Sequence, residues 1–323
     1  MRTRILGYTG VPLTTIGLGT WAIGGGGWAF AWGAQDDADS VATVQRALDL
    51  GINWIDTAAV YGLGHAEEIV GRAIAGRRHE VFIATKCGRV WDEGGTTPYG
   101  RLTADSVRRE AEASLRRLNI EQIDLYQIHW PNPEPQIEEA WATIADLVKE
   151  GKIRYAGVSN FNVAQLRRIQ PIHPVASLQP PYSMLARGVE EELLGYCAAH
   201  RIGVIVYSPM QAGLLTGKVT REWVEQLPDD DWRKRNPRFR EPELSANLAL
   251  VEGLRPIAER AGKTVAQLAL AWVLRRPEVT AAIVGARRPA QIEETVAAGD
   301  WDLSAEEIAA IDALLAARER ALA

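Results

Sequence analysis

Short apolar runs alternate with amphipathic helical patterns along almost the whole chain. The runs have the length and composition of buried strands, and seven of the eight are promptly followed by a helical pattern. The predicted strands cover residues 16–20, 52–56, 81–86, 123–128, 154–158, 175–179, 203–207 and 280–284. Such repetition predicts parallel strands joined by right-handed crossovers. Eight units favour an α/β fold, a (β/α)8 TIM barrel, with an open doubly wound sheet as the structural alternative.

The predicted helices carry recognisable start and stop signals. A helical apolar pattern over residues 137–148 stops at Gly151, and another begins at Thr103. Capping-box sequences begin at Thr264 and at Ser304, each with Gln or Glu three residues later. These signals predict helices on the outside of the barrel.

Two segments interrupt the alternation of strands and helices. Residues 3–13 contain Thr9-Gly10 between short apolar runs, which predicts an N-terminal β-hairpin that caps the barrel floor. Residues 208–242 form a long, charged and proline-containing loop after strand 7. Its charged stretch 229–235 is either a substrate lid or a solvated surface, and both interpretations stay open. Because no linker or internal repeat is apparent, we expect residues 1–323 to form a single domain.

Composition narrows the class of protein. With 47% hydrophobic and 24% charged residues, the 323-residue chain has the balance of a globular protein. Its net charge of −5 argues against a general nucleic-acid binder. There is no apolar run long enough to span a membrane, and the N-terminus lacks a signal-peptide pattern. The two cysteines, Cys87 and Cys197, give no disulfide framework, so we expect a cytoplasmic protein.

One motif resembles a dinucleotide fingerprint but has the wrong context. Residues 17–22 match the G-x-G-x-x-A form. That fingerprint requires a helix that opens directly from the glycines, so that its amides meet the pyrophosphate. Here four glycines follow at 24–27, and the next plausible helix begins near Asp36 to Ser40. We therefore reject a Rossmann fold and expect a flexible loop that borders a pocket.

Four polar residues stand at or just past the ends of three successive predicted strands. They are Asp56, Tyr61, Lys86 and His129. Because the carboxyl ends of parallel strands gather on one face, we expect these side chains to share one pocket. A carboxylate, a phenol, an amine and an imidazole together make a proton-transfer site.

The chemistry of these four residues suits proton donation. A free phenol with a pKa near 10 is a poor acid at neutral pH, and a nearby ammonium would lower the pKa of Tyr61. Lys86 can supply that charge, Asp56 can hold Lys86 in place, and His129 can orient a carbonyl oxygen. Each residue alone also has a structural interpretation, as a helix cap, a packed ring, a solvated amine or a loop contact. Their joint placement favours the functional interpretation.

The segments around these residues resemble the aldo-keto reductase superfamily. The resemblance covers nearly the whole chain in the expected order, and it is strongest to a bacterial branch of general stress and sugar-related reductases. The matching segments are residues 56–62, 84–86, 127–130, 157–161, 207–209, 213–218 and 283–287. The resemblance implies a (β/α)8 barrel that binds NADP(H) without a Rossmann fold. It also implies that Tyr61 is the general acid, supported by Asp56, Lys86 and His129.

The resemblance further implies cofactor contacts that run from the nicotinamide to the adenine. They are Thr20, Trp21, Ser159, Asn160, Gln179, Tyr207, Ser208, Gly213, Leu215, Lys218, Gly285, Arg287, Gln291 and Glu294. Among them, Ser159 and Asn160 would hold the carboxamide, and Tyr207 would stack on the nicotinamide ring. Arg287 and Arg288 offer guanidinium groups suited to a 2′-phosphate, which favours NADPH over NADH. Two surface arginines that precede a helix are the structural alternative.

These observations predict an NADP(H)-dependent enzyme that reversibly reduces an aldehyde or ketone to an alcohol. Aromatic residues past the strand ends are expected to line the pocket for this small molecule: Trp21, Trp28, Trp32, Trp91 and Trp130. We expect no metal, nucleic-acid or membrane partner. Two alternatives stay open. One is a cofactor-binding regulatory or scaffold subunit that resembles potassium-channel β subunits. The other is a sugar or polyol dehydrogenase that works in the oxidative direction, which shares every residue.

Overall fold

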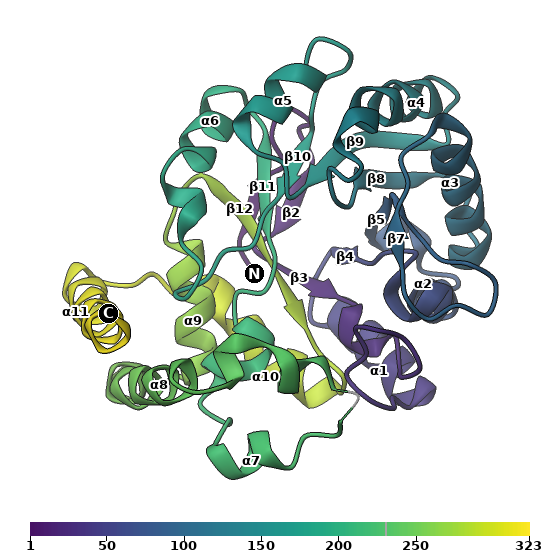
Figure 1. Cartoon of the computed structure of the whole chain (residues 1–323). Helices are drawn as coiled ribbons and strands as arrows, with labels where there is room; N and C mark the ends of the chain where they lie inside the picture. Colours follow the sequence, from purple (N-terminus) through teal and green to yellow (C-terminus); the bar gives the residue numbers. More distant parts are fainter. Residues whose placement is uncertain (230) are drawn as a thin grey trace.

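The computed structural model describes residues 1–229 and 231–323. Within these residues, eight parallel strands close into a barrel in the order β10-β11-β12-β3-β4-β5-β8-β9 (Figure 1). The barrel strands are β3 (Ile16–Gly19), β4 (Trp54–Asp56), β5 (Phe82–Cys87), β8 (Ile123–Ile128), β9 (Ile153–Ser159), β10 (Ser177–Gln179), β11 (Gly203–Val206) and β12 (Val279–Gly285). Each overlaps a predicted run, so the TIM barrel is confirmed. The parallel pairing of β12 with β3 closes the sheet and excludes the open alternative.

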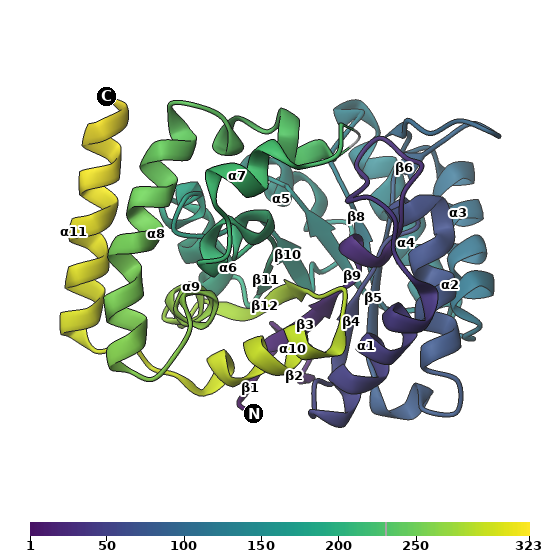
Figure 2. The ribbon, with the colours of Figure 1, turned by 90° about the horizontal axis from the view of Figure 1, so that it is seen from below.

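The helices surround the barrel, and most of them pack on the outer faces of its strands (Figures 1 and 2). They are α1 (Asp37–Asp49), α2 (His65–Ala73), α3 (Ala104–Leu118), α4 (Ile137–Lys149), α5 (Val163–Ile169), α6 (Leu193–Ala199), α7 (Arg221–Glu225), α8 (Glu243–Arg260), α9 (Val265–Leu274), α10 (Pro289–Val296) and α11 (Ala305–Leu322). The C-terminal α11 packs against α8 on the outside of the ring (Figure 2). In the described part of the chain, no helix combines the length and apolar character that a membrane crossing needs.

The predicted helix boundaries agree with the structure. Thr264 and Ser304 both form complete capping boxes, at the starts of α9 and α11. The helix α3 begins directly after Thr103, and α4 ends two residues before Gly151, which adopts the left-handed conformation with φ of 78°. The first barrel helix begins only at Asp37, far beyond the glycines of β3, which confirms the rejection of a Rossmann fold.

The N-terminal hairpin closes the floor of the barrel. The strands β1 (Thr3–Ile5) and β2 (Pro12–Thr14) pair antiparallel, as predicted. Leu6 and Leu13 are fully buried in one apolar cluster with Trp54 from the start of β4. Even a methyl group at Gly7 would meet the backbone of Gly203 at 2.6 Å, so the hairpin lies directly against the start of β11. Because apolar side chains close this end of the barrel, a polar cavity can open only at the opposite end.

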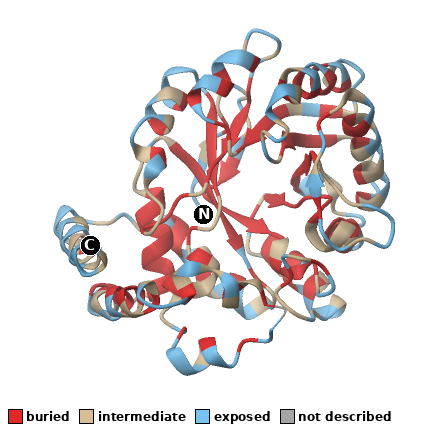
Figure 3. Ribbon diagram, in the orientation of Figure 1, coloured by how far each residue is buried: buried red, intermediate tan, exposed pale blue. Residues whose placement is uncertain are grey.

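The core lies inside the barrel and between the barrel and its helices (Figure 3). Trp54, Trp141 and Trp272 are fully buried, in agreement with their prediction as packing residues. A short second hairpin, β6 (Arg89–Val90) with β7 (Tyr99–Gly100), extends from the end of β5. The hairpin continues the backbone of β5 beyond the barrel and carries Arg89 toward the rim.

The long loop after β11 folds on its own small apolar cluster. The cluster contains Leu214, Val219, Val224, Leu227, Phe239 and Leu244. The loop also holds α7 and several single 3-10 turns, so it is more ordered than a plain solvated connection. Asp230, in the predicted charged stretch, lies outside the described residues. The neighbouring Asp231 and Arg233 are buried and form an ion pair of 2.6 Å.

Candidate active site

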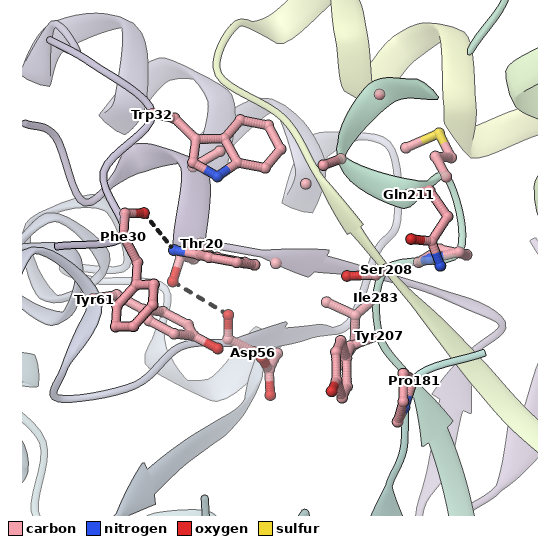
Figure 4. A pocket seen from close by; sticks show the side chains of 18 of the residues that line it. Thr20, Phe30, Trp32, Asp56, Tyr61, Pro181, Tyr207, Ser208, Gln211 and Ile283 are labelled. Carbon is pink, nitrogen blue, oxygen red and sulfur yellow. Dashed lines mark hydrogen bonds between the residues drawn. The ribbon is translucent and has the colours of Figure 1, made fainter. Parts of the chain in front are cut away.

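A cavity of about 960 Å³ opens at the carboxyl ends of the barrel strands (Figure 4). Its walls come from the residues that follow most of the barrel strands, together with the loop after β11. Figure 4 shows Asp56 and Tyr61 on one side of the cavity and Tyr207 on the other. Parallel strands thus bring residues distant in sequence to one rim, as the strand-end rule predicts.

The predicted tetrad is assembled at the base of this cavity. Lys86 Nζ donates hydrogen bonds to Asp56 Oδ2 at 2.6 Å and to the Thr57 carbonyl oxygen at 2.8 Å. The same Nζ lies 3.2 Å from Tyr61 Oη. The Tyr61 ring meets the His129 ring edge to face, with centroids 5.8 Å apart. Lys86 is itself fully enclosed, so it acts on the cavity through Tyr61 and Asp56.

A tight turn after β4 positions Tyr61. Gly62, the next residue, has a φ of 61°, and any side chain there would collide with the backbone oxygen of Gly24. Glycine is therefore needed for the two loops to cross at this point. The crossing holds the Tyr61 backbone against the first βα loop and directs its phenol toward Lys86.

Burial has the largest effect on the pKa of the Tyr61 phenol. Burial and the Asp56 carboxylate together raise the pKa of Tyr61 well above its usual value. This corrects the expectation that the pKa of Tyr61 is lowered, because burial and the Asp56 carboxylate both act in the opposite direction. Burial also lowers the pKa of Lys86, while Asp56 acts against that shift. The phenol therefore keeps its proton at neutral pH, and the Lys86 hydrogen bond is ready to stabilise the phenolate once the proton leaves.

His129 is held as a neutral imidazole. Burial, with the charges of Lys86 and Arg89, lowers the pKa of His129 well below its usual value. The Asn160 amide donates a hydrogen bond of 3.0 Å to the backbone oxygen of His129, which fixes this strand end. A neutral imidazole at the cavity wall can donate one hydrogen bond to a carbonyl oxygen.

A second polar network links the tetrad to the opposite wall. Gln179 Nε2 donates to Asp56 Oδ1 at 2.7 Å, and Ser159 Oγ donates to the Gln179 carbonyl oxygen at 2.8 Å. Tyr207 Oη donates to Asn160 Oδ1 at 2.8 Å. Asn160 has a φ of 64°, a conformation that Asn tolerates better than most residues. The network presents the Tyr207 ring and the Asn160 amide side by side on the cavity wall.

Two cationic residues, Lys218 and Arg287, line the cavity away from the tetrad. Lys218 Nζ lies 2.5 Å from Glu294 Oε2. Arg287 donates to Gln35 Oε1 at 2.6 Å, and to the backbone oxygens of Trp32 and Ala34. Arg287 therefore joins the segment after β12 to the first βα loop, instead of presenting a free guanidinium fork. Arg288 follows as an exposed residue at the start of α10.

The structure brings together the predicted cofactor contacts with one exception. Those that line the cavity are Thr20, Trp21, Ser159, Asn160, Gln179, Tyr207, Ser208, Gly213, Lys218, Gly285, Arg287, Gln291 and Glu294. Leu215 does not, because its side chain is fully buried in the main core and its N–H bonds the Met210 carbonyl oxygen at 3.1 Å. The resemblance placed Leu215 in the cofactor path, whereas the fold turns its side chain into the core.

The predicted aromatic wall is present with one correction. Trp21, Trp28, Trp32 and Trp130 line the cavity, whereas Trp91 packs behind it against the cluster around Trp28. A further tryptophan, Trp232 from the long loop, also lines the cavity. Its side chain reaches the cavity from a short 3-10 turn in the irregular, charged part of that loop.

Several lining residues were missed by the sequence reasoning. They include Arg89, Pro181, Gln211, Arg233, Arg238 and Ile283. Arg89 stands three positions after Lys86, so the rule that selected Lys86 could also have selected it. Arg233 and Arg238 lie in the long loop, where only the fold shows which side chains face inward.

The donor set fits the nicotinamide dinucleotide that the sequence implies. A tyrosine ring, an amide and a serine hydroxyl lie beside the tetrad, which suits a nicotinamide with its carboxamide. Lys218 and Arg287 lie toward the other end, where phosphates would need positive charge. The cavity volume is sufficient for a cofactor together with a small substrate.

Comparisons with known sequences agree with this geometry. The sequence model of the Aldo/keto reductase family matches residues 15–316. The chain is 40% identical over 310 residues to aldo-keto reductase YhdN of Bacillus subtilis, covering 95% of this chain and 91% of the relative. It is 37% identical to the NADH-specific methylglyoxal reductase of Escherichia coli, covering 99% of this chain and 100% of the relative.

The solved structures that resemble this chain are also enzymes of this kind. The glycerol dehydrogenase AKR11B4 from Gluconobacter oxydans has a TM-score of 0.88 and 41% identity, covering 98% of this chain and 95% of that structure. An aldo/keto reductase from Klebsiella pneumoniae, in complex with NADP and acetate, has a TM-score of 0.74 and 31% identity, covering 98% and 96%. Since the match extends over fold and sequence, the chain belongs to the aldo/keto reductase family and is an oxidoreductase that reduces carbonyl compounds.

Proposed function

We propose that this enzyme uses NADP(H) to interconvert an aldehyde or ketone and the corresponding alcohol, with Tyr61 as the proton donor. The single observation that carries the proposal is the contact of Lys86 Nζ with both Asp56 and Tyr61, at 2.6 and 3.2 Å, in the wall of the cavity. When bound, the nicotinamide cofactor supplies the hydride that reaches the carbonyl carbon.

The protein supplies the proton and the charge stabilisation. Tyr61 holds a proton at Oη because burial raises its pKa, so the proton is available when negative charge builds on the substrate oxygen. Lys86 stabilises the resulting phenolate through its hydrogen bond, and Asp56 fixes the Lys86 ammonium in place. Neutral His129 donates a second hydrogen bond to the same substrate oxygen and orients it.

The opposite wall orients the reactants. The Tyr207 ring, held by Asn160, offers one face for stacking, which leaves the other nicotinamide face open to the carbonyl carbon. Ser159, Asn160 and Gln179 hold the carboxamide. Lys218 and the loop around Gly213 neutralise the phosphates.

The proposal also includes a more specific claim, that the enzyme prefers NADPH to NADH. It is supported by the exposed Arg288 at the start of α10 and by a solved relative that contains NADP. The E. coli relative is named NADH-specific, so the preference varies within the family. Fluorescence titration with NADPH and NADH measures it directly. Tighter binding of NADH would overturn this part and leave the reductase assignment unaffected.

The oxidative direction is a second candidate, supported by the relative named a glycerol dehydrogenase at 41% identity. All groups of the tetrad serve both directions, because Tyr61 takes back the proton that it donates. A panel of aldehydes, ketones and polyols, assayed with reduced and oxidised cofactor, measures the two directions together. If nothing in the panel turns over while the cofactor binds tightly, the proposal fails and a regulatory subunit becomes the better interpretation.

A further inference from the structure

Arg89 leaves the barrel beside the proposed catalytic histidine. The pairing of β5 with β8 sets Cys87 opposite Ile128, and the His129 N–H donates to the Cys87 carbonyl oxygen at 3.0 Å. Arg89 begins the short hairpin that continues β5, so it and His129 emerge from neighbouring strands. Both side chains line the cavity. Arg89 is therefore at the tetrad end of the cavity, remote in the sequence from the phosphate-binding segments.

The guanidinium of Arg89 is poorly satisfied by the protein. Its recorded side-chain hydrogen bond is a long one, 3.3 Å from Nη2 to the Pro98 carbonyl oxygen. Within residues 1–229 and 231–323, no carboxylate forms an ion pair with it. By contrast, Lys218 and Arg233, which also line the cavity, contact a carboxylate at 2.5 and 2.6 Å. A partly buried cation without a counter-charge loses hydration and gains little in return.

The surrounding electrostatics agree with an uncompensated charge. Burial lowers the pKa of Arg89, and no carboxylate acts against that shift. The charge of Arg89 also contributes, after burial and Lys86, to the lowered pKa of His129. Because Arg89 and His129 follow paired strands and line one cavity, a single small molecule can contact both.

The cavity that Arg89 lines also carries indole side chains that can contact the carbon skeleton of a substrate. Trp28 and Trp130 line the same cavity, and Trp130 is 45% exposed at its rim. Such indole faces contact the chain or ring of a substrate without specifying its charge. A cation beyond an apolar wall selects molecules that carry an anion at their far end.

We propose that Arg89 is a specificity-determining residue that binds an anionic substituent, a carboxylate or a phosphate, on the carbonyl substrate. The inference rests on the proposed reductase function and narrows its substrate class to oxo-acids and phosphorylated aldehydes. A guanidinium suits either group because its N–H donors match two oxygens at once. The bound anion replaces the missing counter-charge and fixes the distance of the carbonyl from Tyr61.

Matched substrates test the proposal in the unmodified enzyme. Para-carboxybenzaldehyde is compared with para-carbamoylbenzaldehyde, and succinic semialdehyde with its amide, so that shape is kept and charge removed. Glyceraldehyde phosphate and glyceraldehyde form the phosphate arm. We expect kcat/KM to be about tenfold higher or more for the anion of at least one pair, as one charge-assisted hydrogen bond allows. The arm with the larger ratio identifies the preferred anion. Equal kcat/KM within every pair overturns the proposal.

Two variants of Arg89 and one control assign the preference to this side chain. In Arg89→Leu, the ratio of anionic to neutral substrate should fall to about one, while Arg89→Lys should keep part of it because the charge remains. Arg101→Leu removes an exposed arginine near the same hairpin and should leave the ratio as in the wild type. An unchanged ratio in Arg89→Leu overturns the proposal. If that variant does not fold, the ratios measured for Arg89→Lys and for the wild type still decide whether Arg89 sets the preference.

The same assay separates this inference from the function on which it rests. Absence of turnover for every aldehyde, neutral or charged, means that the reductase proposal has failed. Turnover of neutral aldehydes without a preference for anions means that only the role of Arg89 has failed. A role of Arg89 limited to tethering the hairpin through Pro98 would change all substrates equally and leave the ratio unaffected.

Discussion

Trp232 stacks on Trp21 across the mouth of the cavity, with ring centroids 5.4 Å apart and an angle of 18° between the planes. Trp21 belongs to the first βα loop and lies 6.3 Å, centroid to centroid, from the ring of Tyr61. Trp232 belongs to the long loop after β11, which otherwise packs on its own apolar cluster. The stack therefore connects that loop to the aromatic layer over the phenol. This contact favours the lid among the two interpretations that the sequence leaves open.

Removal of the Trp232 ring tests the lid. We expect Trp232→Ala to raise the KM for an aromatic aldehyde by about threefold to tenfold, because an aromatic pair contributes about 0.5–1.5 kcal/mol. Trp232→Phe keeps a ring in place and should restore most of the wild-type KM. Steady-state kinetics on both variants provide the measurement. A wild-type KM in the alanine variant would mean that the loop covers the site without contributing to substrate binding.

Tyr61→Phe tests the assignment of the proton donor. The variant keeps the ring and removes only the hydroxyl that Lys86 contacts, so we expect kcat to fall by about a hundredfold to ten-thousandfold. Cofactor binding, followed by fluorescence titration, should stay close to wild type. Tyr99→Phe, at a tyrosine that is 42% exposed outside the tetrad, serves as the control. Substantial turnover in Tyr61→Phe would exclude the phenol as the acid.

The Lys86–Asp56 pair predicts strong non-additivity in stability. Lys86→Met leaves the Asp56 carboxylate buried without its cation, which we expect to cost about 3–5 kcal/mol in the free energy of unfolding. Adding Asp56→Asn removes that charge while its amide oxygen can still accept from Gln179, so the double variant should be more stable than Lys86→Met alone. Urea denaturation measures all four proteins of the cycle. Simple additivity of the two single effects would contradict the pairing.

The arginines before α10 should have different effects on cofactor binding. Arg287 holds the first βα loop through Gln35 and nearby backbone oxygens, so Arg287→Ala should weaken NADPH and NADH alike. Arg288 is exposed and one residue further on, so Arg288→Ala should weaken NADPH alone. Fluorescence titration of each variant with NADPH and with NADH measures the two affinities that are compared. A selective loss of NADPH in Arg287→Ala would instead mean that Arg287 leaves its loop partners to bind the 2′-phosphate.

Glu110 predicts a pH dependence of stability that is separate from catalysis. Its carboxylate accepts hydrogen bonds from the Gly88 N–H at 2.8 Å and the Ser106 hydroxyl at 3.0 Å, yet burial raises the pKa of Glu110 from 4.5 to about 7. Because the folded pKa exceeds the unfolded value, the folded state binds more protons between these limits. Its stabilisation by the proton is therefore complete below about pH 4.5 and is lost as the pH rises to about 7.

Glu110→Gln removes this titration while its amide oxygen can still accept the Gly88 hydrogen bond. The free energy of unfolding of the variant minus that of the wild type should increase by up to about 3 kcal/mol when the pH is raised from 5 to 8. Urea denaturation at both pH values gives the difference. Glu112→Gln, at an exposed residue of the same helix, should show no comparable change. An equal pH dependence of wild type and Glu110→Gln would exclude Glu110 as the titrating group.

The order of the strands and helices and the residues of the tetrad could be predicted from local patterns along the chain. Strand runs and capping boxes such as that at Thr264 are local patterns, since period and end signals depend on neighbouring residues. The tetrad followed from the same patterns, because the end of a parallel strand always lies at the same rim of a barrel. Asp56, Lys86 and His129 could thus be assigned to one site before any contact was known.

The orientation of each side chain, its hydrogen-bond partners and its charge state depend on the folded structure. Leu215 turns into the core and Trp91 packs behind the wall, although both stand in segments that belong to the site. Arg287 gives its donors to a loop some 250 residues earlier, and burial reverses the expected direction of the Tyr61 pKa shift. These properties depend on which surfaces meet and how much water they exclude. Neither quantity is encoded in the spacing of residues along the chain, so the fold alone sets them.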